Sequence, residues 1–321
     1  MDFARGGKAA IEKINSWAGE KTHGKIPELF AEELDPATKL VLLNALYFKG
    51  AWAEAFEEEL TTEEEFTFSA EKKKFKVPMM HIESNGFRPS ICQEGHLVEL
   101  PYKGGEQSML LFLPNETLLE KPNSTISSLF LQTALLDSSE HTRRMLLMKV
   151  DLALPRFKLE SSVQLKEPLR KMGMRAAFKG GVYGADFSRM TGNRMLKIAQ
   201  VVQKAMIEVN EAGAEAAAAS AVQMIYYSGK VSLPTIALHF NRPFLFALRD
   251  NRLQVNLFVG IVNKPEGGGG GEVVKKVAVE AKKVSPLEHS KEDEENAEND
   301  NEISIDEILQ LLEGREQMSY Y

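Results

Sequence analysis

A run of five glycines, Gly267 to Gly271, divides this 321-residue chain into two parts of different composition. Consecutive glycines have no side chains that can pack, so such a run is a flexible linker. Residues 266–321 carry 15 acidic residues against 6 Lys or Arg, a net charge of −9. Since the whole chain carries −7, residues 1–265 carry +2. The sequence predicts a folded body within residues 1–265 and an acidic tail over residues 266–321.

Within the tail, residues 291–302 are dominated by Glu, Asp and Asn and are expected to be disordered. Ser304 to Glu307 has the form of a capping box, which begins a helix. Apolar residues then recur at the spacing of one helix face, at Ile305, Ile308, Leu309 and Leu312. The sequence predicts a short amphipathic helix that docks on a partner or folds back on the body. The alternative is a frayed appendage.

Composition and motifs exclude several classes of function. One cysteine, Cys92, cannot form an internal disulfide framework or a cysteine-clustered metal site. No apolar run approaches the roughly 20 residues that span a membrane, and the pI of about 5.6 argues against a nucleic-acid binder. The usual hydrolase, zinc-protease and nucleotide-binding motifs are missing. The chain is therefore predicted not to be an enzyme, with no catalytic residue, no metal ligand and no cofactor.

Helical and strand patterns alternate along residues 1–265 without a repeat. Ala9 to Ala18 has the spacing of a helix, with Ile11, Ile14 and Trp17 on one face. Three apolar runs are predicted as strands, the first covered on both faces, the second long and central, the third buried: Lys39 to Phe48, Leu196 to Val209 and Leu253 to Val262. This mixture indicates an α+β fold with extensive sheet.

The segment from Glu208 to Ser228, EVNEAGAEAAAASAVQMIYYS, carries conflicting signals. Four consecutive alanines favour a helix when the segment is taken alone, because alanine has the highest helix propensity. However, a strand is predicted to end near Val209, Gly213 interrupts the run, and the aromatic pair Tyr226-Tyr227 stands where an exposed loop is expected. A segment of small side chains that suits strand, loop and helix is typical of a conformational switch.

Short motifs follow one another in a fixed order along the body: Ala9 to Ile26, Leu40 to Trp52 (LVLLNALYFKGAW), Val77 to Met80, Leu100 to Tyr102, Leu154 to Phe157, Ala185 to Ser188 and Leu238 to Leu248 (LHFNRPFLFAL). In this order, and together with the alanine-rich segment, they resemble the serpins, the serine protease inhibitor family. The resemblance extends from about Phe3 to Pro265. It implies mixed sheets with packed helices and an exposed reactive loop.

The resemblance also implies a mechanism, suicide-substrate inhibition of a serine protease. The loop after Gly213 would be the bait, and the target protease would attack it to form a covalent acyl complex. The cleaved loop would then insert into the main sheet between the strands near Leu40–Phe48 and Leu196–Val209. A new strand of about a dozen residues, at roughly 0.5–1.5 kcal/mol per hydrogen bond, would gain on the order of 10 kcal/mol.

The resemblance places the hinge of this loop at Glu211 and Gly213, and Glu211 is expected to form a salt bridge at the loop's base. The hinge continues with small residues, Ala214, Ala216, Ala217, Ala218 and Ala219. Small side chains do not hinder insertion into a sheet, whereas bulky, charged or proline residues do. The hinge therefore favours inhibition by an intact molecule.

Two ways of counting place the cleaved bond differently. The usual hinge spacing puts it 14 residues past Gly213, at Tyr227-Ser228, which is the preferred assignment. Counting back from Phe240 points instead near Val231-Ser232. The preferred assignment makes the bait residue aromatic.

The bait residue would select the protease. Tyr227 would suit a chymotrypsin-like pocket, and the alternative Lys230 would suit a trypsin-like pocket. Met224 and Tyr226 are further alternatives. The leading hypothesis is thus an inhibitor of a chymotrypsin-like protease. The alternatives are a non-inhibitory binding or carrier protein with this fold, an inactive truncated form, or a scaffold whose acidic tail binds partners.

The chain departs from the family pattern in two ways. The N-terminal third of the family fold, including two strands of the main sheet, is missing, so the strand Leu40–Phe48 should expose an apolar face and an unpaired edge. The sheet-opening region keeps Asn44 and Trp52, but Gln203 stands where the family usually has histidine. We expect the chain alone to be unstable, to inhibit poorly and to self-associate by strand swapping.

The remaining expectations concern location and partners. Two sequons, at Asn115 and Asn123, permit N-glycosylation and favour a secreted, extracellular parent. The chain has no apolar signal-peptide core near its start, so an intracellular location is the alternative. Beyond a target protease, neither nucleic acid nor membrane is an expected partner.

Overall fold

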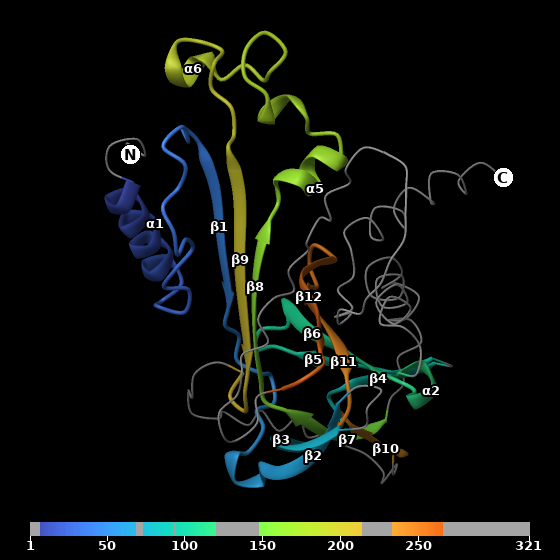
Figure 1. Cartoon of the computed structure of the whole chain (residues 1–321). Coiled ribbons are helices and arrows are strands. Elements are labelled where there is room, and N and C mark those ends of the chain that lie inside the picture. The colour runs from blue at the N-terminus through green and yellow to red at the C-terminus, as the bar shows by residue number, and fades with distance from the viewer. Residues whose placement is uncertain (1–6, 69–72, 93, 120–147, 214–232, 266–321) are drawn as a thin grey trace, which may run out of the picture. The chain divides into compact units, whose positions relative to one another are not determined.

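The computed structural model describes residues 7–68, 73–92, 94–119, 148–213 and 233–265. They form two compact units, both within residues 1–265 (Figure 1). The described residues of the first unit are 7–47 and 160–206, and those of the second lie within 48–159 and 207–265.

The first unit contains a helix, one three-stranded sheet and a set of short helices. Its elements are α1 (Gly7–Lys21), β1 (Val41–Phe48), β8 (Phe157–Gln164), α5 (Lys166–Lys171), the 3-10 helix η3 (Ala176–Phe178), α6 (Ser188–Thr191) and β9 (Gln200–Val209). The order in the sheet is β1-β9-β8, so β9 is the central strand, as the sequence predicted (Figure 1).

Helix α1 covers one face of this sheet. It buries Ile11 and Ile14, which pack in one cluster with Leu43 of β1 and with Val202 of β9. Trp17, predicted on the same apolar face, is instead 40% exposed. The correction has a simple cause, because the buried stripe of α1 is Ala10, Ile11, Ile14 and Ala18, and Trp17 lies beside it.

Strand β1 was predicted to be covered on both faces, and this prediction is wrong. Alternate side chains of a strand point to opposite faces. Val41 and Leu43 pack in the cluster that contains the α1 residues, whereas Leu42 on the other face is 43% exposed. Among the described residues, β1 is also an edge strand of its sheet. The expectation of an exposed face and an open edge therefore matches the described strand.

The second unit is built from two larger sheets. Its elements are η1 (Glu58–Leu60), β2 (Thr62–Phe68), β3 (Lys73–Ser84), β4 (Arg88–Cys92), β5 (Gly95–Pro101), β6 (Gln107–Pro114), α2 (Glu116–Leu119), β7 (Lys149–Pro155), β10 (Thr235–His239), β11 (Phe244–Asp250) and β12 (Val255–Val262). The two sheets have the orders β10-β7-β3-β2 and β12-β11-β6-β5-β4. Strand β10 pairs parallel with β7, and β7 pairs antiparallel with β3, so the first of them is mixed.

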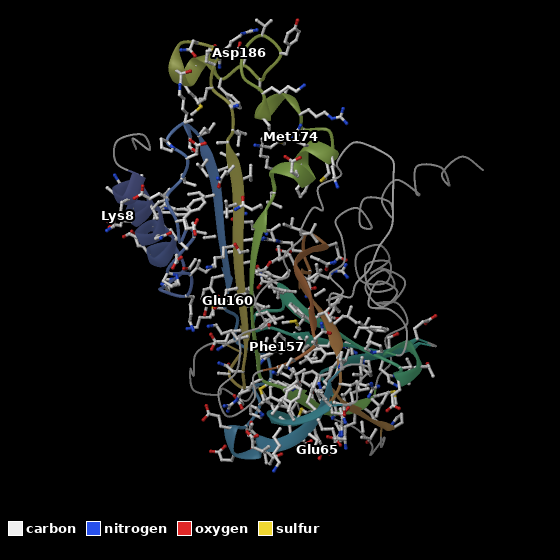
Figure 2. All side chains as sticks on the ribbon, viewed as in Figure 1. Lys8, Glu65, Phe157, Glu160, Met174 and Asp186 are labelled. Carbon is white, nitrogen blue, oxygen red and sulfur yellow. The ribbon has the colours of Figure 1, made fainter. Side chains whose placement is uncertain are left out.

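The core of the second unit draws on both sheets. Val77 and Leu152 of one sheet belong to the same buried cluster as Leu111 and Phe246 of the other. Phe157, labelled in Figure 2, is buried against the ring of Phe246 at 5.5 Å between ring centroids. Mixed sheets with packed helices confirm the predicted α+β class.

Strand β12 corrects a second burial prediction. The run Leu253–Val262 was expected to be buried, yet Val255, Leu257 and Val259 alternate as exposed residues. The reason is that β12 is an outer strand of its sheet. An edge strand covered on one face buries only every second side chain, and an apolar run alone does not reveal this.

Candidate functional site

The chain turns sharply where strand β9 ends. After Val209, the N–H of Gly213 donates a 3.1 Å hydrogen bond to the carbonyl of Asn210. Gly213 has a φ of +79°, and a Cβ there would lie 2.4 Å from the carbonyl oxygen of Gly50 and 2.6 Å from the nitrogen of Trp52. Both the positive φ and the close backbone approach require glycine.

Trp52 holds this turn from the side. Its indole Nε1 donates to the Asn210 carbonyl at 2.9 Å, and its backbone N–H donates to the Ala212 carbonyl at 3.3 Å. The ring is buried and stacks on Tyr102, with 4.3 Å between centroids and 12° between planes. The stacking restricts the indole, so the Trp52 hydrogen bonds fix the turn in one position.

Glu211, inside the turn, forms the strongest polar contacts of this region. Its carboxylate accepts two hydrogen bonds from Arg156 Nε, at 2.6 and 2.8 Å, and one from Thr61 Oγ1 at 2.5 Å. Its backbone carbonyl accepts a bond from Phe56 N–H at 3.1 Å. The residue is 4% exposed. We call Trp52, Thr61, Arg156 and the residues 210–213 the turn cluster.

Two opposing effects act on the pKa of Glu211. Burial raises the pKa of this carboxyl, but the hydrogen bonds from Arg156 and Thr61, with the positive charge of Arg156, hold it below its ordinary value. Glu211 is therefore ionised at neutral pH and holds the turn through charge-assisted hydrogen bonds.

This depressed pKa predicts that stability falls in acid. The unfolded chain takes up the proton near the ordinary value of 4.5, and the folded chain takes it up only at lower pH, so the contribution is complete above 4.5 and disappears as pH falls through the folded value. The measurement is the difference in unfolding free energy between wild type and Glu211→Gln from pH 7 to about pH 3. A difference that does not shrink in acid would contradict the prediction.

The structure brings together three residues that the sequence singled out, Trp52, Glu211 and Gly213. Asn44 and Gln203 lie in the first unit, on β1 and β9, two strands that are neighbours in the sheet. Alternation along these strands puts both on the face opposite α1. No hydrogen bond joins their side chains in the part of the chain that the structure describes.

The other predicted residues are mostly outside the described ranges. This holds for Ala214, Ala216, Ala217, Ala218, Ala219, Tyr227, Ser228, Lys230 and Asn123. Asn115 is described: it lies between β6 and α2, half-buried, and its backbone N–H bonds to the carbonyl of Glu94.

Sequence reasoning missed Arg156, Thr61 and Asn210. Arg156 belongs to the motif Leu154 to Phe157, but nothing in that motif indicates which carboxylate it binds. Its partner Glu211 is 55 residues further along the chain, and Thr61 is 150 residues from Glu211. A salt bridge was expected at Glu211 without a named partner. The structure supplies the partner.

The search for other sites gives two limited findings. Within the described ranges, no group of three or more His, Cys, Asp or Glu side chains has an arrangement that could hold a metal ion. None of the helices in the described residues combines the length and the apolar character needed to cross a membrane.

Comparison with known proteins gives a consistent result. The family model that matches residues 1–265 is described as Serpin (serine protease inhibitor). Iripin-3 of Ixodes ricinus is 41% identical over 268 residues, which cover 82% of this chain and 64% of Iripin-3. Antichymotrypsin-2 of Bombyx mori is 37% identical over 266 residues, covering 81% of this chain and 67% of that protein.

A solved structure agrees. The crystal structure of mouse protein-Z dependent protease inhibitor matches with a TM-score of 0.64 and 31% identity, covering 83% of this chain and 65% of that chain. The match thus spans less than two thirds of the length of Iripin-3 and of the mouse inhibitor.

Proposed function

Since this chain belongs to the serpin family, we propose that it acts as a serine protease inhibitor of the suicide-substrate type, with residues 214–232 as the bait loop. The observation that carries the proposal is the turn cluster. It holds a glycine-dependent, hydrogen-bonded turn directly before a stretch that contains Ala214 and four consecutive alanines, Ala216 to Ala219.

Both ends of the proposed bait loop are anchored in the second unit. On one side, Gly213 packs against the backbone of Gly50 and Trp52. On the other side, Thr235 begins strand β10 and lies opposite Lys149 of β7. A cut within residues 214–232 would separate these two anchors. The part that follows Gly213 would then be free to leave the β10 side.

Strand insertion would use the neighbouring edges of β1 and β9. In the described sheet these strands are hydrogen-bonded to each other, and the bond from Trp52 N–H to the Ala212 carbonyl closes the end next to the turn. Inserting the loop would break such bonds and form two new ladders, one on each side. The net gain is on the order of 10 kcal/mol at about 1 kcal/mol per hydrogen bond.

The closed turn also carries a cost that opening would relieve. The side-chain oxygen of Asn210 is buried and has no hydrogen-bond partner among the described residues. A buried acceptor without a partner costs about 1–3 kcal/mol. The cost supports a closed state that is held by Trp52 and Glu211 and is not the most stable arrangement of the segment.

We further propose a chymotrypsin-like target. Tyr227 lies 14 residues after Gly213, and an aromatic ring suits the pocket of that protease class. The relative from Bombyx mori is named an antichymotrypsin, which supports the same class. The proposed partner is therefore a protease that forms a covalent acyl bond to the carbonyl of Tyr227.

Tyr227→Ala is expected to reduce the yield of denaturant-stable adduct with chymotrypsin by about tenfold or more, because the pocket loses an aromatic ring worth 1–3 kcal/mol or more. Lys230→Ala is the matched control and should leave this adduct unchanged. A denaturing gel measures the adduct, and mass spectrometry of the released peptide identifies the cut bond. Adduct with trypsin only, abolished by Lys230→Ala, would contradict the assignment.

Self-association through β1 is a further proposal. Among the described residues, the outer edge of β1 has no partner strand, and Leu42 is exposed beside it. An open apolar edge invites pairing with a second chain. Leu42→Lys should lower the dimer fraction in sedimentation velocity, whereas Leu60→Lys, at an exposed leucine outside the strands, should not. A monomeric wild-type chain would exclude this proposal.

A further inference from the structure

The α5–α6 segment of the first unit has an unusual surface. Six large apolar side chains are exposed within 24 residues, and we call them the methionine surface: Met172, Met174, Val182, Tyr183, Met190 and Met195. Their exposed fractions run from 49% to 88%. Isolated exposed apolar residues are ordinary, but a group of this density marks an interaction site, and methionine adapts its shape to different partners.

The same segment is strongly basic. Residues 166–197 contain eight Lys and Arg against two acidic residues, a net charge of +6, so the remainder of residues 1–265 carries −4. The two acidic residues are already paired, Glu167 with Arg170 and Asp186 with Arg194. Five cations form no ion pair among the described residues: Lys166, Arg175, Lys179, Arg189 and Lys197.

The methionine surface is held as one piece. The N–H of Gly181 bonds to the carbonyl of Arg194 at 2.9 Å, and the N–H of Ala185 bonds to the carbonyl of Ala176 at 2.9 Å. Beneath these loops, Phe178 and Ile198 belong to one small buried cluster. Met174 and Asp186 lie at the same end of the first unit in Figure 2. A partner would therefore meet a preformed surface.

We propose that the acidic tail of the same chain docks on the methionine surface. Residues 291–313 carry ten acidic residues against one lysine, a net charge of −9. Their apolar stripe, Ile305, Ile308, Leu309 and Leu312, is predicted on one face of a helix. The combination complements a surface that is both basic and apolar, in the manner of an amphipathic helix on an apolar site.

Charge also gives the docking its selectivity. The rest of the body is net negative and repels the tail, whereas residues 166–197 attract it. Reach imposes no restriction. The 38 residues from 266 to 303 can extend over about 125 Å, and a folded body of this size has a radius of gyration of roughly 18 Å.

The experiment is zero-length cross-linking of the full chain with a carbodiimide, which joins lysine amines to carboxylates. Peptide mapping is expected to find Lys166, Lys179 and Lys197 joined to carboxylates of residues 291–313. A mixture of isotope-labelled and unlabelled chains shows that the links form within one chain. Raising the salt from about 0.05 to 0.5 M should suppress them, since the Debye length falls severalfold.

Charge reversal tests specificity. Lys179→Glu/Arg189→Glu should lower the yield of links from Lys166 and Lys197 by about tenfold, since each lost or reversed pair is worth roughly 0.2–1 kcal/mol. Arg88→Glu/Lys103→Glu, the same change at exposed residues of the second unit, should not lower it. Reversing acidic residues of the tail, Glu292→Lys/Asp293→Lys, should restore part of the yield to the first variant.

Three results would overturn the proposal. Links spread evenly over all exposed lysines would show that the tail has no preferred site. Links only between labelled and unlabelled chains would assign the methionine surface to a second copy. Sedimentation with phosphatidylserine vesicles that Lys179→Glu/Arg189→Glu abolishes, without tail cross-links in the free chain, would make an anionic membrane the occupant.

Discussion

Gly213→Val is expected to lower the free energy of unfolding by about 3–4 kcal/mol, one of the two largest effects predicted for this chain. A valine would have to adopt a φ of +79°, which costs about 1–3 kcal/mol. Its Cβ would also lie 2.4 Å from the Gly50 oxygen and 2.6 Å from the Trp52 nitrogen. Both are backbone atoms, so they cannot move aside as a flexible side chain can.

The chain contains a matched control for this substitution. Gly104 has a φ of +91° and no atom within 4 Å of its Cβ position. Gly104→Val therefore carries the backbone cost without the contact cost, and we expect about 1–2 kcal/mol. Urea unfolding followed by tryptophan fluorescence measures both. Equal losses for the two variants would show that the packing of Gly213 against Trp52 contributes nothing.

Arg156→Met is expected to cost about 3 kcal/mol, and Glu211→Gln only about 1 kcal/mol, although the two residues form one pair. The asymmetry follows from burial, because the Arg156 side chain is 42% exposed and that of Glu211 is 5% exposed. Removing the arginine leaves a buried carboxylate with only Thr61 as a side-chain partner. Removing the carboxylate leaves a guanidinium that water can solvate.

A double variant and an exposed pair complete this test. Arg156→Met/Glu211→Gln should be more stable than Arg156→Met alone, because no unpaired charge remains buried. Lys74→Met breaks the pair of Lys74 with Glu65, whose side chains are 58% and 63% exposed, and should cost less than about 1 kcal/mol. The hypothesis fails if Glu211→Gln proves more destabilising than Arg156→Met.

If both predictions hold, the turn cluster is the point at which sequence controls the proposed bait loop. Gly213 would set the path of the chain, and Glu211 would keep the turn closed until the loop is cut. Variants that weaken the cluster should then also change the ratio of inhibition to plain cleavage, which the gel assay measures directly.

The comparison of β1 and β12 with their predictions shows how far sequence patterns reach. Both runs were correctly predicted as apolar elements of a sheet, and both were wrongly predicted to be buried. An apolar run reports that a strand has at least one covered face. Its position in the sheet depends on neighbours from other parts of the chain, and both strands are edges among the described residues.

By itself, the sequence determined the α+β class, the central strand that ends at Val209, and the glycine and carboxylate at Gly213 and Glu211. These are local properties of spacing and residue type, and the order of short motifs added the family. Only the tertiary structure decided which groups meet at the turn. Arg156 and Thr61 reach Glu211 across 55 and 150 residues of chain, and long-range contacts of this kind arise from sheet pairing, which no local pattern encodes.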